Sequence, residues 1–172
     1  KARGKIDSSA GKDFLEAEGL LASGCVVSSE KALRVLRCWK FSENVNRVNV
    51  MPRGASFVLS DTLGLVSTRT GVVSVSRLTR QYPAVFQIFC AWLRHAWPLA
   101  NCFPFTSISV NFNYAAQRHR DSGNVGPSLT KAFGEFDGGD LSYWGEDDGS
   151  LSLDQLGQFS ATSLGTGRSV CL

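Results

Sequence analysis

The sequence predicts an α+β fold, because helical periodicity and strand alternation occur in different segments of one chain. Residues 83–97 place large apolar side chains three and four positions apart after Pro83, a residue that suits the first turn of a helix. Residues 107–114 alternate strictly between apolar and polar side chains, as in a strand with one solvated face. With 172 residues, the chain is about one domain long. We expect a single domain at residues 30–172 behind a polar lead-in at residues 1–29.

The other elements follow from composition and spacing along the chain. Residues 1–29 are rich in Ser, Gly and Lys, so this lead-in is expected to pack loosely. Residues 30–40 show near-helical spacing of apolar side chains behind two serines that can cap a helix. Residues 146–149 are expected to form an acidic, solvated turn and not a second cation site. The further expected elements are strands at 57–66 and 72–78, short strands at 130–136 and 141–144, an irregular or helical piece at 151–159 and the start of another strand at 163–172.

Composition and charge narrow the class of protein. Hydrophobic residues make up 43% and charged residues 19% of the chain, with a mean hydropathy of −0.04, which excludes a wholly disordered or coiled-coil protein. No apolar run approaches the ~20 residues of a membrane span. Residues 1–100 carry 14 Lys and Arg against 7 Asp and Glu, whereas residues 101–172 carry 4 against 8. The basic residues are spread singly, so the charge permits a nucleic-acid partner without indicating one.

The cysteines predict free thiols and neither a disulfide framework nor a zinc knuckle. They are odd in number, lie far apart in the sequence and include no CxxC pair. We therefore expect mostly buried thiols in an intracellular reducing compartment, and the sequence does not say whether this is nucleus, cytoplasm or organelle. The five are Cys25, Cys38, Cys90, Cys102 and Cys171.

One face of the strand expected at residues 107–114 is made of Ser and Asn. The opposite face carries Ile, Val, Phe and Tyr. Short amides and hydroxyls suit the inside of a barrel that holds a polar ligand, and they suit an exposed sheet surface equally well. Both interpretations stay open on the residues alone.

A candidate metal site follows this strand. His119 and Asp121 are two positions apart, so on an extended backbone both side chains leave the same face, with Cα atoms ~6.6 Å apart. An imidazole nitrogen and a carboxylate oxygen are two of the three groups in the 2-His-1-carboxylate triad that binds Fe(II). The His-x-Asp tripeptide also arises by chance, and Asp121 is equally suited to cap a turn over residues 122–124.

Three segments together resemble the core of the 2-oxoglutarate/Fe(II) dioxygenase superfamily, and look most like its TET/JBP-like branch with the algal and protist relatives. The resemblance covers residues 105–172 well and the earlier chain loosely. The segments are Asn111-Phe-Asn-Tyr, then His119-Arg-Asp121-Ser-Gly-Asn124-Val-Gly126-Pro127-Ser128, then Ala132-Phe-Gly-Glu-Phe-Asp-Gly138-Gly139-Asp140-Leu141.

This resemblance implies a fold, a reaction and a site. The fold is a double-stranded β-helix of jelly-roll or cupin type, incomplete in the chain as given, with the N-terminal helices packed on it. The reaction is hydroxylation of a C–H bond with Fe(II) and 2-oxoglutarate; the branch implies a nucleobase methyl group, and a protein or small-molecule substrate fits the motif equally. His119 and Asp121 become the metal ligands, and Asn111, Asn113 and Ser128 become candidates for lining the pocket.

The sequence departs from the family at the distal ligands. No histidine follows Asp121, the other histidine is His95, and Arg168 is the single basic residue after Lys131. Three explanations stay open, in this order: a fragment whose later strands carry the missing groups, a degenerate domain, or His95 reaching in from its helix. The chain stops at Leu172 inside an expected strand, which favours the fragment. The degenerate domain would be a non-catalytic subunit of a larger assembly that covers an open sheet edge.

Overall fold

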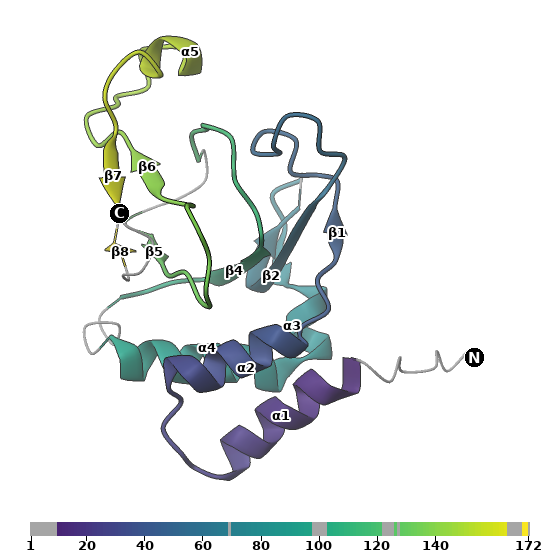
Figure 1. Ribbon diagram of the computed structural model, residues 1–172. Coiled ribbons are helices and arrows are strands. Elements are labelled where there is room, and N and C mark those ends of the chain that lie inside the picture. The colour runs from purple at the N-terminus through teal and green to yellow at the C-terminus, as the bar shows by residue number, and fades with distance from the viewer. Residues whose placement is uncertain are drawn as a thin grey trace. The chain divides into compact units, whose positions relative to one another are not determined.

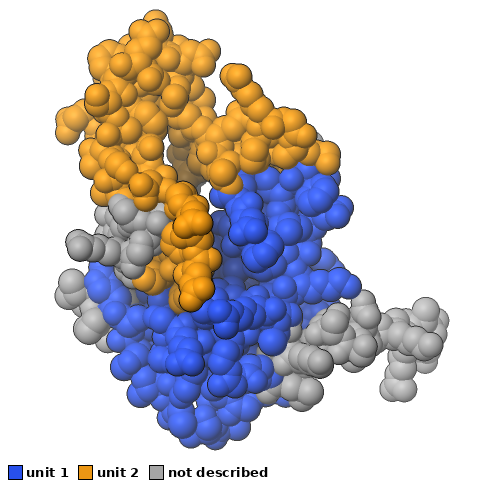
Figure 2. All heavy atoms as spheres, viewed as in Figure 1, with its two compact units in different colours: residues 1–45, 57–114 blue, residues 46–56, 115–172 orange. Residues whose placement is uncertain are grey.

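A computed structural model describes residues 10–68, 70–97, 103–121, 126, 128–164 and 170–171 (Figure 1). It contains helices and antiparallel strands, which confirms the predicted α+β class. The chain forms two compact units (Figure 2). Unit 1 comprises residues 1–45 and 57–114, and unit 2 comprises residues 46–56 and 115–172.

Four helices belong to unit 1, and two of them follow directly from the sequence. Helix α4 begins at Pro83 and buries one apolar face through Val85, Ile88 and Leu93. Helix α2 begins after Ser28, whose hydroxyl accepts a hydrogen bond from the backbone N–H of Lys31. The helices are α1 (Ala10–Ala22), α2 (Ser29–Cys38), α3 (Arg77–Gln81) and α4 (Pro83–Ala96).

Helix α1 lies where the sequence predicts a loose lead-in. Ala17 is fully buried, and Glu16 forms an ion pair with Arg34 of α2. Helix α1 also packs against α4. Among the α1 side chains that the structure describes, the buried one is a small alanine, which gives a weak periodic signal in a polar segment.

The sheet of unit 1 is built around one long strand. Leu59 of β2 pairs with both Glu43 of β1 and Phe112 of β4, so these two strands flank β2. The end of β2 forms an antiparallel hairpin with β3, which stops earlier than predicted because Ser76 caps helix α3 by accepting from the Thr79 N–H. The strands are β1 (Glu43–Asn44), β2 (Val58–Ser67), β3 (Val73–Val75) and β4 (Ser107–Phe112).

Gly64 permits the close pairing of β2 with the segment that leads into β4. Its φ of +93° lies in the left-handed region, and a Cβ at this position would overlap the carbonyl oxygen of Thr106. The backbone N–H of Gly64 also donates to the Thr79 hydroxyl, 2.6 Å away. A side chain at residue 64 would therefore disturb both the sheet and the start of α3.

Strand β4 shows the predicted alternation over residues 107–111 and ends two residues earlier than the predicted strand at 107–114. Val110 is buried and Ile108 is half-buried, whereas Ser107, Ser109 and Asn111 are exposed. The strand ends at Phe112, which is half exposed. The centroids of the Phe112 and Phe41 rings are 5.5 Å apart. The polar face of β4 is therefore accessible within unit 1.

Unit 2 contains two small antiparallel pairs and one short helix (Figure 1). Strand β5 is much shorter than the predicted strand at 130–136, whereas β6 closely matches the prediction at 141–144. The helix begins with a capping box in which Ser152 and Gln155 bond each other's backbone N–H. The elements are β5 (Leu129–Thr130) paired with β8 (Val170–Cys171), β6 (Leu141–Tyr143) paired with β7 (Thr162–Leu164), and α5 (Leu153–Leu156).

Two sequence expectations concern the chain as a whole. Within the described residues, no helix is both long and apolar enough to cross a membrane. Cys25, Cys38 and Cys90 are free thiols, as predicted, but the first two are exposed, so the expected burial is wrong for them. Burial raises the pKa of the Cys90 thiol.

Candidate metal centre

His119 and Asp121 face each other in unit 2. The His119 Nε2 atom lies 3.6 Å from the Asp121 Oδ1 atom, and the side chains are 28% and 61% exposed. Two ligand atoms that each lie ~2.1 Å from one ion are at most about 4.2 Å apart. The observed separation lies within this limit, so the distance is compatible with both atoms binding one ion.

A backbone contact sets the orientation of the imidazole ring. His119 Nδ1 lies 2.7 Å from the carbonyl oxygen of Gln117. A carbonyl oxygen only accepts hydrogen bonds, so Nδ1 carries a hydrogen, and in the neutral ring Nε2 then has a free lone pair. Metal-binding histidines commonly donate their second nitrogen in this way. The donor set thus fits a cation, because this nitrogen lies 3.6 Å from the Asp121 Oδ1 atom.

Two arginines on either side of His119 bind the segment that runs from β6 to α5. The Arg118 Nη1 atom donates to the Leu153 carbonyl oxygen at 2.6 Å, and its guanidinium lies 5.2 Å from the centroid of the Trp144 ring. Gly157 leaves room for this group, since a Cβ there would overlap the guanidinium. Sequence analysis misses Gly157, because no residue near it in the sequence indicates that the Arg118 side chain, 39 positions earlier, packs against it.

Arg120 forms a two-pronged ion pair with Asp147. Its Nε atom donates to Oδ2 at 2.5 Å, and its Nη2 atom donates to Oδ1 at 2.7 Å and to the Leu151 carbonyl oxygen at 2.8 Å. These hydrogen bonds hold the pKa of Asp147 below its usual value. The prediction of a solvated acidic turn is thus wrong for Asp147, whose side chain is only 11% exposed.

The described residues supply two ligands and no third. None of their His, Cys, Asp and Glu side chains form a group of three or more that could hold a metal ion. His95 is exposed at the end of α4 in unit 1. The turn that Asp121 is suited to cap falls on residues 122–124, which lie outside the described part of the chain.

The three candidate pocket residues are divided between the units. In unit 1, the Asn111 Oδ1 atom accepts a hydrogen bond from the buried Ser60 hydroxyl at 2.7 Å, so this oxygen already has a partner within the sheet. Asn113, also in unit 1, is exposed and has a φ of +44°. Ser128 is exposed in unit 2.

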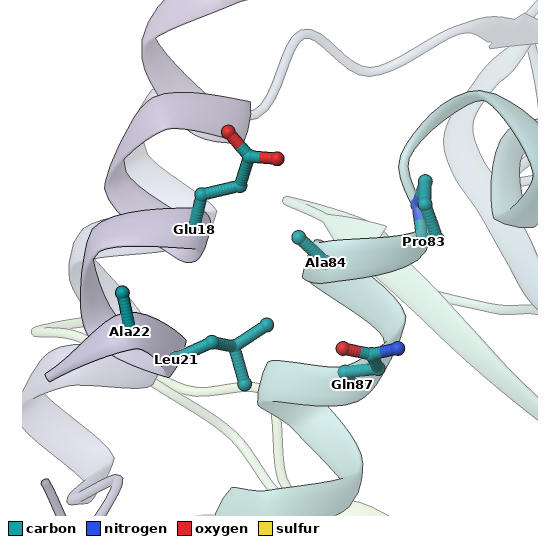
Figure 3. Close-up of a pocket in the computed structure, with 6 residues that line it drawn as sticks. All are labelled: Glu18, Leu21, Ala22, Pro83, Ala84 and Gln87. Carbon is teal, nitrogen blue, oxygen red and sulfur yellow. The ribbon is translucent and has the colours of Figure 1, made fainter. Parts of the chain in front are cut away.

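A separate hollow lies in unit 1, between helices α1 and α4 (Figure 3). Its lining includes one charged side chain, that of Glu18, beside apolar groups and the amide of Gln87. It contains no combination of nucleophile, base or metal ligands. The lining residues are Glu18, Leu21, Ala22, Pro83, Ala84 and Gln87.

Comparison of the chain with protein-family models, curated proteins and solved structures found no match.

Proposed function

We propose that this chain is an Fe(II)/2-oxoglutarate-dependent dioxygenase-like domain in which His119 and Asp121 hold the metal. One observation carries the proposal: His119 Nε2 lies 3.6 Å from Asp121 Oδ1, while the Gln117 carbonyl oxygen contacts the other ring nitrogen. The motif resemblance supplies the identity of the metal and the co-substrate. A double-stranded β-helix body belongs to the same proposal, and the antiparallel pairs β5–β8 and β6–β7 are compatible with it.

The residues around the pair suit a dication. His119 supplies a neutral nitrogen donor, and Asp121 supplies a negative charge that offsets part of the positive charge. Arg120 would repel a cation, but its charge is balanced by Asp147 and its guanidinium is held by that carboxylate. When bound, Fe(II) would supply the site at which O2 oxidises 2-oxoglutarate to succinate and CO2 and converts a C–H bond of the substrate into an alcohol.

The substrate within this proposal is a nucleobase methyl group, as the TET/JBP-like resemblance implies. Such a base in duplex DNA would have to be flipped out of the stack to reach the metal. A protein or small-molecule C–H bond fits the same pair of ligands. Turnover assays with a methylated oligonucleotide, a peptide pool and a set of small molecules would distinguish the three substrate classes.

A second candidate is a non-catalytic dioxygenase-fold subunit of a larger assembly. The observation that favours it is the absence of a third ligand among the described residues. The two-stranded sheets of unit 2 also leave strand edges without a described partner, which a neighbouring protein could cover. In this role the protein would not decarboxylate 2-oxoglutarate.

Anaerobic Fe(II) titration tests the leading proposal. The wild-type protein should bind iron, and His119→Ala should lose most of the binding. His95→Ala is the matched control because His95 is the only other histidine of the chain, and it should bind as the wild type does. Negligible binding by the wild type would overturn the metal site. Iron binding without decarboxylation of 2-oxoglutarate would favour the non-catalytic subunit.

A further inference from the structure

We propose that Arg120, held by Asp147, is a positioning residue that keeps His119 and Asp121 facing each other. This inference rests on the proposed metal site and adds a device that sets its geometry. Arg120 is the one residue between the two ligands in the chain, so whatever fixes Arg120 also fixes the backbone that carries both of them. The following observations concern unit 2 alone.

The Arg120 guanidinium is fixed in both position and orientation. Two parallel N–H groups meet the two oxygens of Asp147 at 2.5 and 2.7 Å, and the Leu151 carbonyl oxygen accepts a third bond at 2.8 Å. A planar guanidinium that donates from two nitrogens to one carboxylate cannot rotate freely, whereas an ammonium group held by a single contact can. The Arg120 side chain is 33% exposed and that of Asp147 is 11% exposed, so water competes weakly for this pair.

Asp147 is itself held in place before it meets Arg120. Its Oδ1 atom accepts from the Gly149 N–H at 3.2 Å, and its backbone N–H donates to the Trp144 carbonyl oxygen at 3.2 Å. These contacts form a tight local turn with the carboxylate at a defined point. Little side-chain freedom remains to be lost when Arg120 binds, which favours precise positioning.

Alternate residues of the segment make different kinds of contact. Arg118 and Arg120 bind the segment of residues 144–157, whereas His119 and Asp121 contact each other. The contacts thus separate the two kinds of residue: both arginines bind the segment of residues 144–157, and the two candidate ligands remain together.

A purely structural ion pair would make a different prediction. Its loss would lower the stability of unit 2 and leave the metal affinity of the remaining folded protein unchanged. A positioning residue should lower metal affinity in protein that is still folded. The Arg120→Lys variant distinguishes the structural role from the positioning role further, because lysine keeps the positive charge but lacks the planar pair of N–H donors.

The experiment measures anaerobic Fe(II) affinity and the geometry of the metal-free pair. Arg120→Ala should weaken binding by about 10–100-fold, the range found when partners of metal-bound ligands are removed. Arg120→Lys should recover part of that loss, and Asp147→Asn, which keeps one acceptor, should weaken binding by about tenfold. The matched controls are Arg53→Ala and Asp140→Asn, exposed residues of the same unit, which should bind within about twofold of wild type.

A through-space NMR contact between the His119 ring and the Asp121 side chain provides the metal-independent measurement. The wild type should show it and Arg120→Ala should lose it, with circular dichroism confirming that the variant is folded. Wild-type contact and affinity in folded Arg120→Ala would overturn the inference. If wild type shows the contact but binds no iron, the proposed function fails while the NMR comparison still decides the role of Arg120. If Arg120→Ala does not fold, Arg120→Lys and Asp147→Asn decide it.

Discussion

The interactions inside unit 1 differ in kind from those inside unit 2. Of the 17 buried apolar side chains among the described residues, 14 lie in unit 1, including Leu63, Val85 and Ile88 with no exposed surface. Unit 2 contributes Val50, Met51 and Leu156. Its described polar contacts include the Arg120–Asp147 pair and the hydrogen bond from Arg118 to the Leu153 carbonyl oxygen. The candidate metal pair thus lies in the unit with the smaller apolar core.

This contrast predicts different sensitivities. Apolar burial involves no titrating group, so unit 1 should respond mainly to the loss of core volume and little to pH. Ion pairs and ligand binding change with solution conditions, so unit 2 should respond to metal and to acid. Four measurements test the contrast, from the largest expected effect to the smallest.

Truncation of Ile88 should have the largest effect. Ile88→Ala removes a fully buried side chain from α4 and should lower the free energy of unfolding of unit 1 by about 2–5 kcal/mol. Denaturant titration followed by hydrogen exchange assigns the loss to unit 1. Val26→Ala, at a position 57% exposed, is the control and should change stability by less than about 0.5 kcal/mol. Equal losses in both variants would contradict an apolar core at α4.

Iron should stabilise unit 2 and leave unit 1 unchanged. At a free metal concentration of about 100 times Kd, binding adds about 2.7 kcal/mol to the stability of the binding unit. Hydrogen exchange under anaerobic conditions should show slower exchange at residues 115–121 and 141–156. His119→Ala should abolish this protection. Protection confined to unit 1 would place the metal elsewhere.

Gly64→Ala should destabilise unit 1 by about 1–3 kcal/mol. The substitution forces a non-glycine residue to a φ of +93° and against the backbone of Thr106. Gly19→Ala is the matched control, because a Cβ in that position of α1 meets nothing within 4 Å. Thermal unfolding of the two variants measures the difference. An unchanged midpoint for Gly64→Ala would show that β2 and the segment before β4 pair more loosely than described.

Acid should weaken unit 2 through Asp147. Its pKa is lower in the folded protein than in the unfolded chain, because Arg120 donates to its carboxylate. The resulting contribution to the free energy of unfolding is fully present above the unfolded-state pKa of about 4, and it is lost as the pH falls through the folded-state pKa. Hydrogen exchange of unit 2, corrected for intrinsic rates, should accelerate in that range. Asp147→Asn should flatten the dependence.

Asp148 provides a comparison for this measurement. Its pKa is also lowered, by hydrogen bonds from Ser150, so Asp148→Asn should remove a separate part of the acid sensitivity. The Arg120–Asp147 pair should remain in that variant. Identical profiles for the wild type and Asp147→Asn would contradict the role of the ion pair in the stability of unit 2.

The fold was predictable from sequence where its signal is local. The period of α4, the serine cap of α2 and the alternation of β4 each depend on residues within a few positions of one another. Helix α1 was missed because a buried alanine contributes little to an apolar pattern. The strand predicted at 72–78 ends at Val75, because Ser76 caps helix α3. From the sequence alone, a serine that caps a helix cannot be told from a serine within a strand.

The candidate site shows the same limit. The spacing of His119 and Asp121 suggested that their side chains could share an ion, because two positions on a strand define one face. The partners of the neighbouring arginines lie 27 and 35 positions further along, at Asp147 and Leu153. No short motif encodes a contact at that separation. Only the folded chain shows that the acidic turn is an ion-pair partner.

The backbone bond from the Gln117 N–H to the Val50 carbonyl oxygen, 3.0 Å long, joins the two separate segments of unit 2. During synthesis, Val50 leaves the ribosome 67 residues before Gln117. At ~5–20 residues per second, residues 46–56 wait roughly 3–13 seconds for their partners. The nascent chain can assemble the long strand β2 and helices α3 and α4 in that interval, but unit 2 can close only after Gln117 and the residues beyond it have been made.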